Sequence, residues 1–104
     1  MKSNDSIRIN KGSAEVFNIC MNALENNKFT IQEYDSETLV IDASASISWD
    51  SWGEYINLKI EELDDNSCLV RLYSKSKFPI TLIDWGKNDD NIGRLISELQ
   101  KMSD

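Results

Sequence analysis

Residues 55–75 read YINLKIEELDDNSCLVRLYSK. On both sides of the polar residues 64–67 (DDNS), apolar side chains recur at every second position, which is the period of a half-buried strand. Asp, Asn and Ser favour turns because their short side chains bond to nearby backbone groups. The stretch therefore predicts an antiparallel hairpin with one apolar face. That face holds Ile56, Leu58, Ile60, Cys68, Val70 and Leu72.

The residues before this hairpin predict a strand, a helix and two further strands. Residues 6–10 and 29–34 suit short strands, and residues 39–48 alternate over a longer run with small residues at its centre. Apolar residues at helical spacing predict a helix over 14–26. Ser13 is a favoured N-cap residue, and Asn26-Asn27 suits a helix end because Asn tolerates the left-handed conformation.

A second helical stripe closes the chain and ends near Met102. Pro79, the only proline, marks the exit from the strand ladder. Asn88 is the expected N-cap of the helix, and Asp89 and Asp90 in its first turn suit the helix dipole. The predicted fold class is therefore α+β: a two-layer β-α-β4-α domain over 1–104, with an antiparallel five-stranded sheet and two helices packed on one face.

Composition limits the function. The 104 residues contain no histidine and carry a net charge of −7. Histidine is the side chain that acid–base and zinc chemistry most often recruit, so we expect no enzyme, no cofactor and no metal. The negative charge argues against nucleic acid and anionic membranes as partners. The polar start and the lack of a long apolar run suggest a cytoplasmic protein. We expect a monomer or a weak dimer.

Both cysteines lie on apolar stripes. Cys20 belongs to the predicted first helix and Cys68 to the hairpin, so we expect both to be reduced core residues. The acids at the hairpin tip lack the spacing of a calcium loop and read as a solvated turn.

From about residue 38 to 102 the chain resembles a bacterial family of domains of unknown function. The pieces are Trp52-Gly53-Glu54, then Arg71 with Ser74-Lys75, then Asp84-Trp85-Gly86-Lys87-Asn88 before the last helix. The spacing before the last motif is longer here, and acids follow Asn88 where the family has basic residues. The element order also resembles a TATA-binding-protein half and, more loosely, a helix-grip domain. These resemblances imply the fold and no activity.

Charge is segregated along the sequence. Residues 33–65 hold ten acidic residues and one basic residue, Lys59, whereas residues 71–87 hold four basic residues and one acid. Arg71 and its alternate neighbours should share the outer sheet face, and the plain interpretation is cross-strand pairing with acids such as Glu61. The functional interpretation is an acidic surface that attracts a basic protein. The candidate interaction surface comprises Trp49, Trp52, Tyr55, Arg71, Tyr73 and Lys75.

Three hypotheses remain. The leading one is a non-enzymatic interaction module, for instance an inhibitor or immunity-like protein that binds a basic partner. The alternative is a carrier of a small apolar ligand held between the C-terminal helix and the sheet. The third is an enzyme that works through carboxylates such as Asp84 and Glu54, which would need a strongly raised pKa.

Overall fold

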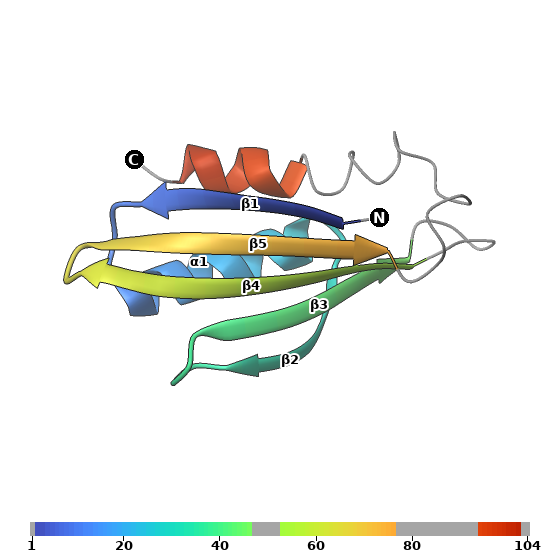
Figure 1. Cartoon of the computed structure of the whole chain (residues 1–104), viewed down its shortest axis with the longest axis horizontal. Helices are drawn as coiled ribbons and strands as arrows, with labels where there is room; N and C mark the ends of the chain where they lie inside the picture. Colours follow the sequence, from blue (N-terminus) through green and yellow to red (C-terminus); the bar gives the residue numbers. More distant parts are fainter. Residues whose placement is uncertain (1, 47–52, 77–93, 103–104) are drawn as a thin grey trace.

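The chain folds into one sheet with helices on one side of it. A computed structural model describes residues 2–46, 53–76 and 94–102 (Figure 1). Residues 94–101 form the C-terminal helix as far as it is described. The other elements are β1 (Lys2–Ile9), α1 (Ser13–Asn26), β2 (Thr30–Asp35), β3 (Val40–Ser46), β4 (Gly53–Asp64) and β5 (Ser67–Ser76). The predicted α+β class and β-α-β4-α order are confirmed.

The predicted hairpin forms the centre of the sheet. The strand order is β1-β5-β4-β3-β2, and every neighbouring pair is antiparallel. In the β4–β5 hairpin Leu58 lies opposite Leu72, which places the two apolar faces on the same side. Helix α1 connects the two outermost strands, β1 and β2 (Figure 1). This connection crosses the whole sheet and covers its apolar face.

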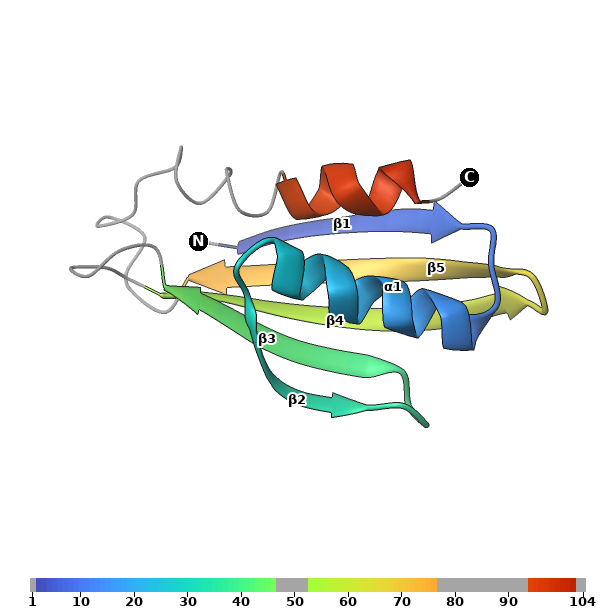
Figure 2. The same ribbon diagram turned by 180° about the vertical axis from the view of Figure 1, so that it is seen from behind.

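The core lies between the helices and this apolar face. Figure 2 shows α1 across the sheet, with the C-terminal helix next to β1. Leu24 of α1 and Leu95 and Leu99 of the C-terminal helix are fully buried in the same cluster as the strand residues. Burying a side chain of this size contributes about 1.5–3 kcal/mol. The fully buried large side chains are Ile9, Val16, Cys20, Leu24, Ile41, Ile56, Leu58, Cys68, Val70, Leu95 and Leu99.

A polar contact fixes the C-terminal helix to the end of α1. Glu98 accepts hydrogen bonds from the side-chain amides of Asn26 and Asn27, each at 3.0 Å. The Asn27 amide also donates to the carbonyl of Ala23 at 2.8 Å. The last residue of α1 and its C-cap, Asn27, therefore each present a donor to a carboxylate on the other helix.

The predicted end of α1 at Asn26-Asn27 is confirmed, whereas the predicted N-cap and the conformation expected of Asn were wrong. The N-cap of α1 is Gly12, not Ser13, and it makes no side-chain capping bond. A Cβ on Gly12 would lie 3.3 Å from the Asp65 carbonyl of the β4–β5 turn, so close tertiary packing favours glycine there. At the other end Asn27 has a φ of −105°, and Lys28 takes the left-handed conformation with a φ of 68°.

Two strand starts also differ from the sequence prediction. β1 begins at Lys2 rather than near Ser6, because pairing with β5 extends through polar residues that carry no hydrophobic pattern. β3 begins at Val40, since Leu39 has a φ of 62° and belongs to the turn. In that turn the Leu39 N–H donates to the Asp35 carbonyl at 2.8 Å.

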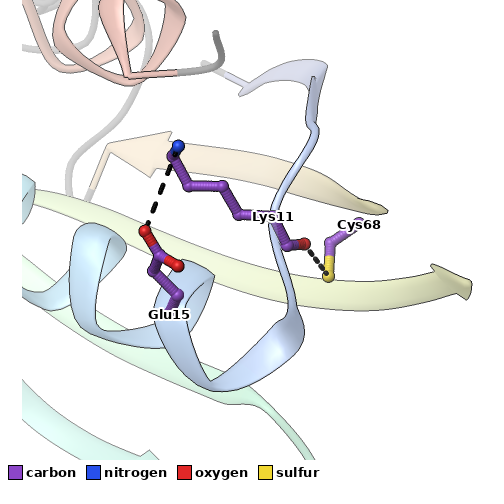
Figure 3. A network of polar contacts seen from close by, with 3 residues as sticks. All are labelled: Lys11, Glu15 and Cys68. Atoms are coloured by element: carbon purple, nitrogen blue, oxygen red, sulfur yellow. Dashed lines mark hydrogen bonds and ion pairs between the residues drawn. The ribbon is translucent and has the colours of Figure 1, made fainter. Parts of the chain in front are cut away.

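The two cysteines are free thiols in the core. Burial, with Cys68 as a second cause, raises the pKa of Cys20 to about 12. Burial also raises the pKa of Cys68, whose Sγ lies 3.5 Å from the Lys11 carbonyl (Figure 3). The Nζ of Lys11 lies 4.0 Å from Glu15 Oε2. Since the thiolate is the reactive species, these groups are poor nucleophiles in the folded protein.

Candidate functional site

The sheet has an outer face, opposite the helices, whose composition differs from that of the core. Alternation along each strand sends every second side chain to this side. The outer face comprises these described positions: Ser6 and Arg8 of β1, Thr30, Glu33 and Asp35 of β2, Val40, Asp42 and Ser44 of β3, Tyr55, Asn57, Lys59 and Glu61 of β4, and Leu69, Arg71 and Tyr73 of β5. Both helices pack on the other side, so no element in the described part of the chain covers the outer face.

The register brings together part of the predicted interaction surface. Tyr55, Arg71 and Tyr73 lie on neighbouring strands of the outer face, and Lys75 pairs with Tyr55 through the backbone. Trp49 and Trp52 lie outside the described residues, as do Asp84, Asn88 and the rest of the last motif. Within the motif of the predicted resemblance, Arg71 faces outward, whereas Ser74 is buried on the core side.

Asp42 is the centre of the best-defined polar contact on this face. Its Oδ1 accepts hydrogen bonds from the Tyr55 hydroxyl at 2.8 Å and from the Asn57 side-chain amide at 2.6 Å. The bond to Asp42 is the main reason that the pKa of Tyr55 rises to about 12. A carboxylate held by two donors keeps a fixed position, so Asp42 presents a placed negative charge on the sheet.

Arg71 forms the predicted cross-strand pair with Glu61. Its Nε lies 2.7 Å from Glu61 Oε2. The hydrogen bond to Arg71 lowers the pKa of Glu61, and the same bond raises the pKa of Arg71. Both side chains are about half exposed, so the pair contributes little to stability. It does neutralise one acid of the outer face.

The negative charge that remains on the outer face gathers toward β2. A shallow hollow of about 320 Å³ lies at the β2–β3 corner. It is lined by Glu33, Tyr34, Asp35, Thr38, Val40 and Asp42. Three of these residues are carboxylates, whereas Val40 supplies an apolar wall. This combination suits a side chain with an apolar stem and a cationic head.

One of these carboxylates also organises the adjacent turn. Asp35 Oδ1 accepts the backbone N–H of Glu37 at 2.8 Å and that of Thr38 at 3.3 Å. These bonds lower the pKa of Asp35. The carboxylate therefore stays charged over the neutral range, and the turn beside the hollow has a fixed shape.

The described residues hold neither a cluster of metal ligands nor a thiol with a lowered pKa. No group of three or more potential metal ligands (His, Cys, Asp or Glu) converges within the described ranges. The thiols have raised pKa values, and the ordered carboxylates are occupied as hydrogen-bond acceptors. The carboxylates that line the hollow can attract a cationic side chain.

Sequence reasoning identified Tyr55 and the acidic region but missed the contact between Asp42, Asn57 and Tyr55. Alternation places all three on one face, and that signal was present in the sequence. Which residue of β3 lies opposite Asn57 depends on the register, which is Asp42↔Asn57. A shift by one residue would send Asp42 to the other face of the sheet.

No helix in the part of the chain that the structure describes is both long and apolar enough to cross a membrane. No protein-family model matches the sequence. No curated protein sequence matches it either.

Solved structures do share the fold. An uncharacterised protein from Bacillus thuringiensis superposes with a TM-score of 0.71 at 10% identity, covering 99% of this chain and 96% of that one. The di-domain ARO/CYC BexL from the BE-7585A biosynthetic pathway matches with a TM-score of 0.68 at 14% identity, and 99% of this chain spans 45% of that protein.

Norcoclaurine synthase from Thalictrum flavum, solved in complex with dopamine and hydroxybenzaldehyde, matches with a TM-score of 0.59 at 8% identity. That match covers 98% of this chain and 85% of the synthase. At such identities the similarity establishes a shared architecture, one that other proteins use for uncharacterised roles as well as for biosynthetic chemistry.

Proposed function

We propose that this chain is a non-enzymatic binding module whose outer face engages a basic protein partner. The observation that carries the proposal is an outer face that no described element covers, with its carboxylates gathered beside β2. Complementary charge of this kind raises association rates and selects among partners.

Other features of the outer face support this role. The Asp42 carboxylate is held by Tyr55 and Asn57, so little side-chain freedom is lost when a partner binds it. Tyr55 and Tyr73 supply aromatic surface close to the acids, and aromatic residues often anchor interfaces. An inhibitor or immunity-like protein would use such a surface to cover a basic site on its target.

Affinity capture from lysate at low and raised salt tests the proposal. The double variant Glu33→Gln/Asp42→Asn removes two charges from the outer face. The matched control Glu15→Gln/Glu25→Gln removes two charges from exposed positions on α1, in the other layer. We expect a basic protein that is retained at low salt by the wild type and the control but lost by the outer-face variant. A bound protein that resists salt and ignores the outer-face variant would contradict the proposal.

A second candidate is a carrier for a small apolar ligand between the C-terminal helix and the sheet. Ser74 favours it, because this residue is only 3% exposed on the core side and its hydroxyl has no hydrogen-bond partner among the described residues. Buried polar groups normally have partners, and a ligand would supply one. The synthase with the same architecture was solved with two small aromatic molecules bound.

Native mass spectrometry of the protein purified from cells tests the carrier. A retained small molecule that is lost with Ser74→Ala, while the fold is kept, would support it. Protein of the apo mass alone, together with unchanged melting in the presence of hydroxybenzaldehyde as an added probe, would count against it.

A further inference from the structure

The two edges of the sheet differ in what lies beside them in the described part of the chain. β1 has the C-terminal helix beside it in both views (Figures 1 and 2). At the opposite edge, β2 pairs with β3 and with no other described strand. Five of its six residues are exposed, and Tyr34 is 62% exposed. A strand in this position presents backbone donors and acceptors to any chain that can align with it.

Only part of this edge has regular geometry. The register between β2 and β3 shifts between Ile31 and Glu33, which marks a bulge. Bulges bend an edge strand and interrupt pairing. After the bulge, the register runs without a break from Glu33 to Asp35, opposite Asp42 to Val40. The regular segment therefore lies directly beside the acidic hollow.

The side chains of residues 33–35 alternate between the two faces of the sheet, acidic on one face and aromatic on the other. Glu33 and Asp35 point to the outer face, where they line the hollow. Tyr34 points to the opposite face, and its ring lies 6.1 Å from the ring of Phe17 on α1. A strand added alongside would therefore have its alternate side chains next to carboxylates on one face and next to an exposed aromatic ring on the other.

We infer that the β2 edge pairs with an extended segment of the basic partner, in which lysine or arginine alternates with an apolar residue. This inference rests on the proposed function and names the segment that the outer face recognises. Cationic side chains lie beside Glu33 and Asp35, one of them entering the hollow against Val40. The apolar side chains pack against Tyr34. Backbone hydrogen bonds supply affinity, and the alternation supplies specificity.

A second copy of this chain does not fit the same edge. If two β2 strands paired antiparallel about Tyr34, Glu33 of one copy would lie opposite Asp35 of the other. Like charges directly opposite each other destabilise a strand pair. The acids therefore select against self-association and in favour of a basic strand.

The probe is a capped heptapeptide in which lysine alternates with valine, titrated into the full-length isotope-labelled protein and followed by NMR. We expect the amide shifts to concentrate on β2 and the adjacent part of β3. Glu33→Gln should weaken binding about twofold to fivefold, the range for one exposed ion pair. Glu25→Gln, which removes the same charge from α1, should leave the affinity unchanged.

Two methylated forms of the peptide test the backbone pairing. N-methyl groups on the lysine amides block one edge of the peptide, and N-methyl groups on the valine amides block the other. We expect at least one form to bind tenfold more weakly or worse. If both methylated forms bind as tightly as the unmethylated peptide, strand addition is overturned. Amide shifts centred on Asn57 and Tyr73 in that case would leave the proposed function standing.

Two further outcomes would also overturn the inference. One is an absence of peptide binding while the full-length partner is still captured. The other is concentration-dependent dimerisation through β2, measured by sedimentation, because it would make a second copy the occupant of the edge.

Discussion

Replacing Leu99 with alanine tests whether the C-terminal helix belongs to the core or lies over it as a detachable lid. Leu99 is fully buried in the same cluster as the strands and α1. Truncating a buried leucine to alanine costs about 2–5 kcal/mol, from lost transfer free energy and from the cavity left behind. We expect a loss near the middle of this range, about 3 kcal/mol, because the neighbouring Glu98 contacts to Asn26 and Asn27 limit how far the helix can settle into the space.

For a chain of this size, a loss of about 3 kcal/mol lowers the melting midpoint by roughly 12–24 °C. The variant should nevertheless stay folded at room temperature, because domains of this kind have about 5–15 kcal/mol of stability. Urea unfolding followed by circular dichroism measures the change. Leu99→Met keeps the volume and should cost less than about 1.5 kcal/mol. Lys101→Ala, on the exposed side of the same helix, should change stability by less than about 0.5 kcal/mol.

A loss below about 1 kcal/mol for Leu99→Ala, with the urea dependence unchanged, would refute this reasoning. It would mean that the helix contributes little to the folded core. That result would favour the carrier hypothesis, since a loosely held helix can open over a ligand.

Three further predictions concern single groups. If no ligand occupies the protein, Ser74→Ala should raise the free energy of unfolding by about 1 kcal/mol, because it removes a buried hydroxyl without a partner. Urea unfolding measures the change, and a loss of stability would show that the hydroxyl is hydrogen-bonded. Cys20 and Cys68 should react with Ellman's reagent at pH 8 only as fast as the protein unfolds, and rapid labelling in native buffer would contradict their burial. The raised pKa of Tyr55 means that its bond to Asp42 contributes stability fully below about pH 10, which is lost as the pH rises toward about 12. Urea unfolding over that range should show a steeper decline for the wild type than for Tyr55→Phe, which keeps only the decline due to the buried thiols. Equal declines would exclude this cause.

Part of the candidate site on the outer face could be predicted from the sequence. The alternation in residues 55–75 placed Tyr55, Arg71 and Tyr73 together, and the charge count pointed to Glu61 as a partner for Arg71. The hollow at the β2–β3 corner was not foreseen. It depends on the pairing of β2 with β3 and on the turn that Asp35 organises, and neither leaves a periodic signal.

The sequence by itself determined the layers, because period-two strands and two amphipathic helices can bury their apolar sides only against one another. It did not determine the cap at Gly12 or the left-handed residues Lys28 and Leu39, since local preference gives way where packing and backbone bonding require another conformation. The tertiary structure alone decided which strands form the edges and which acids meet which donors. Strand order and register arise from contacts between distant residues, and a strand pattern looks the same at the centre of a sheet as at its edge.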